Sequence, residues 1–487
     1  MTHSEPDAVR SPGAEQADLA AASEPSVRVS DAPAQTAHVA GDVIPFGQAV
    51  KAWFLISLQT FGGPAGQIAV MQRTLVDEKR WIGQRRFLHA LNYCMLLPGP
   101  EAQQLAIYTG WLLNGRRGGL VAGTLFVLPG MLALLGLSAI YVAFGDTPLL
   151  TGLFLGLSAA VIAIVVQAVV RVSRRSLTHP SLIVLAVAAF LALTFFAVPF
   201  PIVVLGAGLV GWVLGRFWPA ITTPPAKKTV DDGPAPLISD DHLHADQPSL
   251  RRSGLILTSG LTVWALPILA VGLAFGWDSI FVDQGLFFSG AALVTFGGAY
   301  AVLAYVAQQA VNVYGWVLPG EMVRGLALAE TTPGPLIMVV QFVAFVGAYR
   351  APGDLNPWTA AILASLLVTW VTFVPCFLFV LLGAPYVERL RHNRSLSAAL
   401  TGITAAVVGV IANLAVYFAA HTLFTQSQQW NLGPMHAQIP VPASISLPAV
   451  ALTAVACLLI FVIKWSVLRT LGACAILGIL TQILLLR

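Results

Sequence analysis

The sequence predicts an all-α polytopic membrane protein made of two inverted repeats, and three observations support that fold class. Of its 487 residues, 57% are hydrophobic and only 10% are charged, whereas an ordinary soluble domain has ~25% charged residues. Apolar runs such as 398–418 are long enough to cross a bilayer core as a helix. Motifs of the first half also recur in the second half. So few charges cannot coat a soluble enzyme, a nucleic-acid binder or a secreted module of this length.

The repeat is visible as two motifs that recur at a constant offset of 235 residues. Thr-Phe-Gly-Gly stands at 60–63 and again at 295–298, and Pro-Gly-Pro stands at 98–100 and again at 333–335. Two copies of one unit are typical of secondary transporters. We therefore expect a first repeat at 45–217 and a second repeat at 281–487.

Each half reads as about six apolar segments, and one unmatched apolar segment, 254–276, connects the halves as an extra transmembrane helix. Because six plus one is odd, the second half starts on the opposite side of the membrane and the repeats are antiparallel. Residues 1–44, rich in Ala, Ser, Pro and acids, are predicted to be a disordered cytoplasmic tail, and 218–253 a cytoplasmic linker. The expected segments are 46–72, 87–113, 119–144, 149–170, 181–198 and 201–217, then 284–310, 322–347, 358–384, 397–420, 446–463 and 468–486.

The positive-inside rule places the N-terminus in the cytoplasm and the C-terminus outside. Basic clusters such as Arg116/Arg117 and Arg171/Arg174/Arg175 then fall inside. The basic loop 73–86 disagrees, since it lies outside if every segment crosses. It returns inside if the first two segments of each half, which Gly and Pro interrupt, are re-entrant hairpins. Thirteen full spans and nine spans plus four hairpins both remain open.

These interruptions are the candidate substrate site. Broken helices persist in a membrane only where they face protein or a water-filled cavity. The residues after each break start a half-helix whose free N–H groups and dipole suit an anion, although kinks or close-packing sites are the alternative interpretation. The predicted substrate-binding residues are Gly62, Gly63, Pro64, Gln67, Pro98, Gly99, Pro100, Glu101, Gln103, Gln104, Gly297, Gly298, Thr331, Thr332 and Gly334.

Glu101 has two interpretations, a capping carboxylate or a proton-coupling acid. Lys51 and Arg324 are further candidate charge partners. We predict no metal and no cofactor, because the pair His242 and His244 lies in the polar linker and no other cluster has ligand spacing. The basic loop either funnels anions or anchors the protein on the cytoplasmic side, through Arg73, Lys79, Arg80, Arg85 and Arg86.

The motifs at 61–69 (FGGPAGQIA) and 97–106 (LPGPEAQQLA), with Trp81 and the run 110–115 (GWLLNG), resemble the long, two-domain form of the chromate ion transporter family. The resemblance implies an efflux transporter of the bacterial inner membrane that lowers cytoplasmic chromate and confers chromate resistance. The acidic N-terminal tail is not part of the family pattern.

The expected function is therefore secondary active export of chromate, driven by membrane potential, by protons or by both. No Gly-x₄-Gly-Lys-Ser/Thr loop is present, which argues against ATP hydrolysis. Sulfate or another oxyanion is the alternative substrate. A membrane-embedded enzyme is the alternative from another class, and it would need a catalytic constellation that the spans lack. We expect chromate and lipid as partners and no nucleic acid. The oligomeric state stays open, with a homodimer as one option.

Overall fold

A computed structural model describes residues 43–145, 147–217, 236–238, 243, 249–386, 394–433 and 435–486. Residues 1–42 of the predicted tail, most of the predicted linker and the pair His242 and His244 lie outside these residues. Ile44, which we assigned to the tail, is only 4% exposed and belongs to a hydrophobic cluster, so the assignment to a disordered tail was wrong for this residue.

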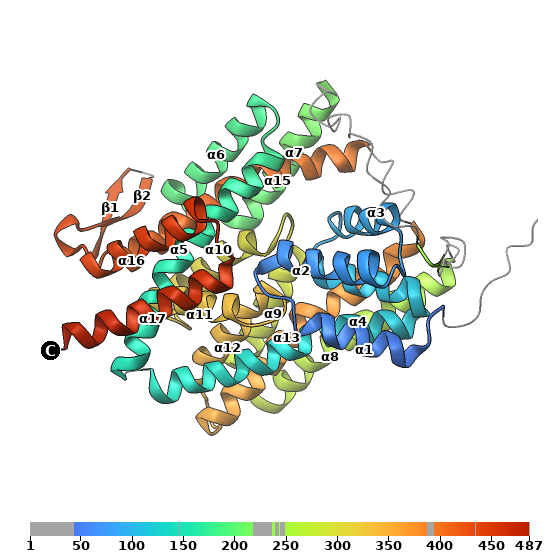
Figure 1. Cartoon of the computed structure of the whole chain (residues 1–487), viewed down its shortest axis with the longest axis horizontal. Helices are drawn as coiled ribbons and strands as arrows, with labels where there is room; N and C mark the ends of the chain where they lie inside the picture. Colours follow the sequence, from blue (N-terminus) through green and yellow to red (C-terminus); the bar gives the residue numbers. More distant parts are fainter. Residues whose placement is uncertain are drawn as a thin grey trace, which may run out of the picture. The chain divides into compact units, whose positions relative to one another are not determined.

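The first half and the connecting segment form eight helices among the described residues (Figure 1). The helix after the linker begins inside the range that we predicted as linker. In order they are α1 (Phe46–Ser57), α2 (Gly63–Gln72) with a π-helical turn (Arg73–Glu78), α3 (Gln84–Cys94), α4 (Glu101–Phe144), α5 (Pro148–Ser176), α6 (Pro180–Phe196), α7 (Phe200–Phe217) and α8 (Leu250–Phe275).

The second half repeats this order, including a π-helical turn at the same place. A β-hairpin lies between α15 and α16, and its register pairs Ser427 with Pro440. The elements are α9 (Ile280–Leu293), α10 (Ala299–Gln308) with its turn (Gln309–Val313), α11 (Pro319–Thr331), α12 (Val339–Arg350) after a short 3₁₀ turn (Leu336–Met338), α13 (Pro357–Gly383), α15 (Arg394–Leu423), β1 (Ser427–Leu432), β2 (Met435–Pro440), α16 (Leu447–Cys457) with a π-helical turn (Leu458–Val462), and α17 (Val467–Leu485).

Seven helices of the described chain are long and apolar enough to cross a membrane, and four shorter helices are also apolar. The predicted class, an all-α polytopic membrane protein, is confirmed. The seven long helices are α4, α5, α7, α8, α13 with the short turn after it, α15 and α17.

The longest helix, α4, is in fact two antiparallel arms. Its backbone leaves helical geometry at Asn114 and at Gly115, where φ is +57°. A Cβ at Gly118 would lie 2.2 Å from the carbonyl oxygen of Gly110, and a Cβ at Gly123 would lie 2.4 Å from Ile107. Such contacts require residues 101–113 to run back along residues 116–144. The chain therefore reverses at 114–115.

The two broken segments of the first half are re-entrant hairpins, because the loop between them packs in the same cluster as their outer ends. The amide N–H of Val43 donates to the Leu113 carbonyl at 3.1 Å, and Asn114 Nδ2 donates to the Ile44 carbonyl at 2.6 Å. The start of α1 and the end of the returning arm thus lie together. The Leu237 N–H, in the linker, donates to the carbonyl of Arg80 in the basic loop at 2.8 Å. The basic loop therefore lies on the linker side, as the hairpin arrangement requires.

The second half has the same hairpins. A Cβ at Gly347, near the end of α12, would lie 2.9 Å from Trp316 in the α10–α11 loop and 3.0 Å from Gln284 near the start of α9. The start, middle loop and end of this region therefore meet, as they do in the first half. Of the two arrangements that the sequence left open, the chain adopts the one with four hairpins.

The two halves exchange their last helices. α17 packs along α5 and α7 packs along α15, which are the most extensive helix contacts in the protein (Figure 1). A Cβ at Gly156 would lie 1.8 Å from the Cys474 carbonyl oxygen, and a Cβ at the equivalent Gly402 would lie 2.3 Å from that of Ala207. Small residues let helix backbones approach this closely in membranes. Neither half can therefore complete its packing alone.

We expect Gly156→Ala to destabilise the protein by about 1–3 kcal/mol, because the added methyl group overfills a backbone contact. Gly206→Ala is the matched control, since nothing lies within 4 Å of a Cβ at that position in α7. Thermal unfolding of the two variants in one detergent measures the difference. Equal melting temperatures would show that the close α5–α17 contact does not stabilise the fold.

Candidate functional site

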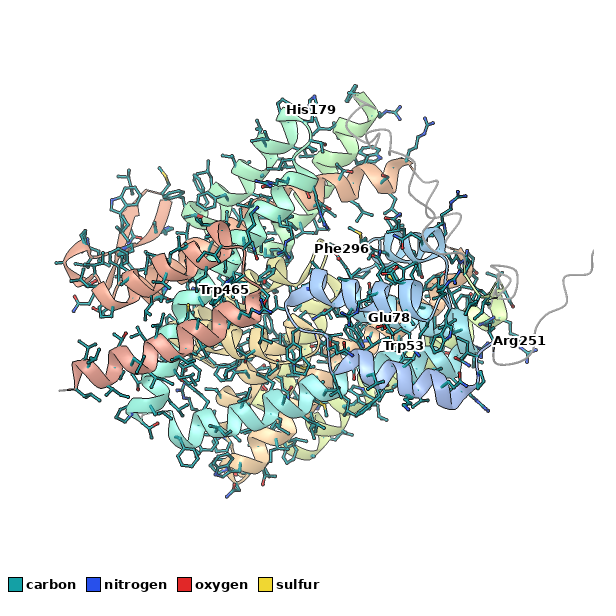
Figure 2. The ribbon with its side chains drawn as sticks, viewed as in Figure 1. Trp53, Glu78, His179, Arg251, Phe296 and Trp465 are labelled. Carbon is teal, nitrogen blue, oxygen red and sulfur yellow. The ribbon has the colours of Figure 1, made fainter. Side chains whose placement is uncertain are left out.

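Four breaks interrupt the hairpins, at residues 58–62, 95–100, 294–298 and 332–335; we number them one to four. The Gly99 N–H in break two donates to the Thr295 carbonyl in break three at 2.8 Å. The Gly334 N–H in break four donates to the Thr60 carbonyl in break one at 3.0 Å. These are the same bond with the halves exchanged, because the positions are related by the repeat. Figure 2 shows Phe296 of break three among helices of both halves.

The glycines of the breaks have backbone angles that other residues rarely adopt. All six have positive φ: Gly62 (80°), Gly63 (71°), Gly99 (121°), Gly297 (74°), Gly298 (107°) and Gly334 (103°). Glycine reaches this region without a steric penalty. At Gly99 a Cβ would also lie 2.9 Å from Cys376 Sγ. The breaks predicted from the sequence are confirmed.

Two of the predicted glutamines stabilise the backbone of the breaks. Gln67 Nε2 donates to the Gly334 carbonyl at 2.5 Å, and Gln104 Nε2 donates to the Pro98 carbonyl at 2.6 Å. Thr60 Oγ1 adds a second acceptor for the Gly334 N–H at 3.1 Å. Because hydrocarbon cannot solvate these groups, such bonds are needed to keep a broken helix in a membrane.

Other polar groups beside the breaks are left without partners in the described part of the chain. Gln103 is fully buried, and both polar atoms of its amide lack a hydrogen bond. The N–H groups of Gly62 and Gly63 also find no backbone acceptor there, and they stand at the positive end of α2. Buried polar groups normally have partners. These groups are therefore available to a bound polar molecule.

Two carboxylates lie at the site. Glu101 begins α4 directly after break two, as predicted. Glu330 is 2% exposed near the end of α11, and it accepts a hydrogen bond from the Tyr300 hydroxyl at 2.5 Å. The Tyr300 hydroxyl in turn lies 3.9 Å from the Cβ position of Gly63. Tyr300 and Glu330 thus connect the second half to the start of α2.

The remaining predicted residues line the same breaks. The hydroxyls of Thr331 and Thr332 donate back to carbonyls of α11, at 2.8 and 3.0 Å. Pro64 lies in the first turn of α2, and Pro100 is the residue that precedes α4. The structure therefore brings the whole predicted set to one region. Binding by these residues stays a prediction.

The basic loop is only partly within reach of the breaks. Arg73 reaches break one by a hydrogen bond to Gln59 at 2.9 Å. The sixteen residues from Gly63 to Glu78 span about 24 Å at 1.5 Å per residue, and Lys79 and Arg80 lie beyond them. Arg85 and Arg86 lie in the first turn of α3, whose other end meets break two. Lys79 Nζ instead lies over the Trp81 ring, 4.8 Å from the ring centroid.

The other candidate charges lie elsewhere. Lys51 is exposed on α1. Arg324 donates to the Tyr141 hydroxyl at 3.3 Å, beside the bidentate pair of Glu321 with Arg350. Within the placed residues, no three His, Cys, Asp or Glu side chains converge as metal ligands do.

Sequence reasoning overlooked several residues of this region. Thr60 and Thr295 belong to the recurring motif, so their position was a usable signal. Arg171 and Arg175 are four residues apart near the end of α5, which packs against α11, the helix that carries Glu330. Their spacing puts both on one helix face, but we had assigned them only as cytoplasmic markers. Tyr300 carries no sequence signal, because its role depends on Glu330.

Comparison with known proteins now gives the family. The family model described as Chromate transporter matches residues 47–212 and, a second time, residues 282–479. The chain belongs to the chromate transporter family. This resemblance was expected from the motifs, and the two matches coincide with the two exchanged halves. No solved structure is significantly similar to this member of the family.

Curated relatives cover most of the transporter's length. The "Chromate transport protein" of Pseudomonas aeruginosa is 33% identical over 401 residues, which are 81% of this chain and 86% of the relative. The protein of the same description from Cupriavidus metallidurans is 30% identical, over 74% of this chain and 80% of its own. A "Probable chromate transport protein" from Synechococcus elongatus is 25% identical, over 80% of this chain and 91% of the relative.

Replacing Gln67 and Gln103 separately should distinguish a structural glutamine from one that awaits a ligand. Gln67→Leu leaves the Gly334 carbonyl without its side-chain donor, so we expect a loss of about 1–3 kcal/mol in stability. Gln103→Leu removes an amide that has no partner, so we expect stability to be unchanged or increased. Melting temperatures of both purified variants test this. Equal losses would mean that Gln103 also has a structural partner.

Proposed function

We propose that this transporter exports chromate from the cytoplasm across the bacterial inner membrane. The observation that supports this most strongly is the meeting of four broken helices at one point. There the amides of Gly62, Gly63 and Gln103 lack partners within the described chain, and the carboxylates of Glu101 and Glu330 lie beside the breaks. The distribution of basic residues supports a cytoplasmic N-terminus and an external C-terminus.

A tetrahedral dianion suits this site because its oxygens accept several hydrogen bonds at once. Free N–H groups at the start of a helix bind such anions without a fixed positive charge. The names of the relatives favour chromate as the substrate. Sulfate remains the second candidate, since it has the same charge and shape and the same amides would bind it.

The membrane potential is sufficient to drive export. Moving a dianion out of a negative interior releases about 4.6 kcal/mol per 100 mV, twice the value for one charge. Such export would lower cytoplasmic chromate and confer resistance to it. Protons could be coupled through Glu101 or Glu330, the two carboxylates at the breaks, and we propose these as the coupling candidates.

Inside-out vesicles provide the main test. Vesicles that contain the protein should accumulate labelled chromate when energised, and an ionophore that collapses the potential should abolish the accumulation. Gln103→Leu, inserted at the same level, should lose at least tenfold in rate, because the buried amide no longer binds the anion. Equal accumulation with and without the protein would refute export.

Substrate choice is tested in the same vesicles by competition. If chromate is the preferred substrate, a large excess of sulfate should reduce chromate uptake only weakly. Strong inhibition by equimolar sulfate, together with transport of labelled sulfate, would instead identify a general oxyanion transporter. Chloride at the same ionic strength serves as the control for screening.

Proton coupling predicts a specific defect in Glu101→Gln or Glu330→Gln. These variants keep the shape of the side chain but cannot exchange a proton. We expect uptake to lose its response to an imposed pH gradient while it keeps its response to the potential. Asp354→Asn, in an exposed loop, is the control and should keep both. Unchanged pH responses in both glutamate variants would exclude these two residues as coupling sites.

A further inference from the structure

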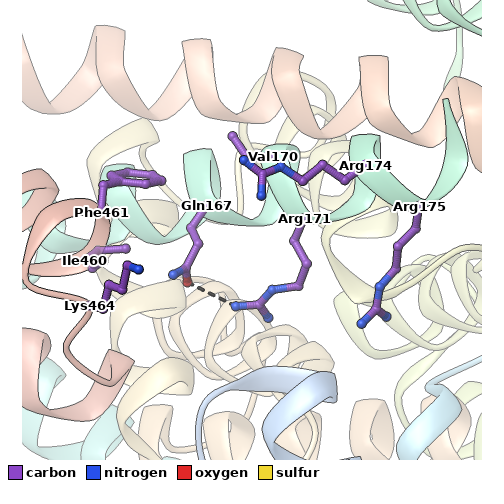
Figure 3. A pocket seen from close by; sticks show the side chains of 8 residues that line it. All are labelled: Gln167, Val170, Arg171, Arg174, Arg175, Ile460, Phe461 and Lys464. Carbon is purple, nitrogen blue, oxygen red and sulfur yellow. Dashed lines mark hydrogen bonds between the residues drawn. The ribbon is translucent and has the colours of Figure 1, made fainter. Parts of the chain in front are cut away.

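Two cavities, separate from the breaks themselves, occupy equivalent places in the two halves. The first has a volume of about 560 Å³ and lies between the end of α5 and the turn that follows α16. Figure 3 shows its side chains from close by. Its polar lining consists of Gln167, Arg171, Arg174, Arg175 and Lys464.

The second cavity has a volume of about 590 Å³ and lies between α15, α10, the end of α6 and the β-hairpin. The offset of 246 residues that relates α5 to α15 converts Gln167 to Asn413, Arg171 to Tyr417 and Arg175 to His421. All three of these α15 residues line the second cavity. The two cavities are therefore counterparts under the internal repeat.

Their charges differ completely. The first cavity has four Lys or Arg side chains in its lining, whereas the described lining of the second has none. Asn312, Asn413, Gln429 and His436 instead supply neutral or weakly basic groups there. By the orientation that the basic residues support, the charged cavity opens toward the cytoplasm and the neutral one toward the outside.

The cations of the first cavity form no direct ion pair within the described chain. Arg171 donates to Gln167 at 3.1 Å. Lys464 also has a φ of +60°, a conformation that is unfavourable for a residue with a side chain. Cations in a concave site concentrate anions.

The helices that line the two cavities also contact helices that border the breaks. α5 packs against α11, which ends at break four, and α15 packs against α10, which begins at break three. Figure 3 shows Arg171 and Arg175 extending from the same side of α5. An anion held at Arg171 would thus lie on the helix that leads toward break four.

We propose that the two cavities are the two vestibules of one path. The cytoplasmic vestibule, with Arg171, Arg174, Arg175 and Lys464, binds the oxyanion before it reaches the breaks. The outer vestibule, under the β-hairpin, is neutral, so it binds the departing oxyanion only weakly. This inference rests on the proposed export of a divalent oxyanion. The electrochemical gradient still sets the direction of net transport. The charge of each vestibule sets the oxyanion concentration at which transport from that side saturates.

Chromate kinetics in inside-out vesicles test the cytoplasmic vestibule. We expect Arg171→Gln and Lys464→Gln each to raise KM about five- to tenfold, because each removes one charge that attracts a dianion. We expect kcat to change less than twofold. We also expect KM to increase less with salt concentration in these variants than in wild type. Arg171→Lys should restore most of the affinity. Arg116→Gln, an exposed cytoplasmic charge at the α4 turn, is the matched control and should leave KM unchanged.

The outer vestibule is tested by giving it a charge. Tyr417→Arg creates the counterpart of Arg171, so chromate inside the vesicles, on the former outer side, should inhibit uptake at about five- to tenfold lower concentration than in wild type. Tyr417→Phe is the control and should behave as wild type. Unchanged inhibition in Tyr417→Arg would overturn the assignment of the outer cavity to the path.

A binding measurement separates failure of this inference from failure of the proposed function. Equilibrium dialysis of labelled chromate and labelled sulfate against the purified protein in nanodiscs should detect binding that Arg171→Gln/Lys464→Gln weakens at least tenfold. Binding that persists in this variant, or transport with an unaltered KM, overturns the vestibule even if export is real. Vestibule binding without transport would refute export alone, and no binding to wild type would refute the vestibule.

Discussion

The structure depends on one pair of backbone hydrogen bonds, Gly99 N–H to the Thr295 carbonyl and Gly334 N–H to the Thr60 carbonyl. Each bond joins a break in one half to a break in the other half. Four interrupted helices inside a membrane would otherwise have unpaired backbone groups at their ends, each at a cost of several kcal/mol. Because each half satisfies the breaks of the other, neither hairpin pair is stable alone.

The exchange of terminal helices also joins the two halves. α17 closes on α5 and α7 closes on α15 through glycine contacts that bring backbones together. α5 also packs against α11, which ends at break four, and α15 packs against α10, which begins at break three, so the exchanged helices adjoin the breaks. For the dianion that we propose as the substrate, a site made of backbone amides would have a further advantage. Dipoles bind the charge without a fixed counter-ion that would oppose its release.

The two halves have kept the backbone and diverged in their side chains. Glycines with positive φ recur in all four breaks, because the bend requires them. Gln67 and Gln104 are confined to the first half, and Tyr300 and Glu330 to the second. The cavities on either side differ in the same way, four cations in one and none in the described lining of the other. A repeated scaffold thus carries two equivalent cavities of unlike charge.

The sequence by itself determined the membrane class, the repeat and the positions of the breaks, since composition, spacing and glycine usage are local properties. It also indicated the family and most residues of the site. It could not decide between spans and hairpins, because that depends on the side on which the basic loop 73–86 lies, and only long-range contacts such as Leu237 N–H to the Arg80 carbonyl place that loop. It could not reveal that Gln67 donates a hydrogen bond to the Gly334 carbonyl, or that Tyr300 donates one to Glu330. Those relations join residues far apart in the chain, and only tertiary packing brings them together.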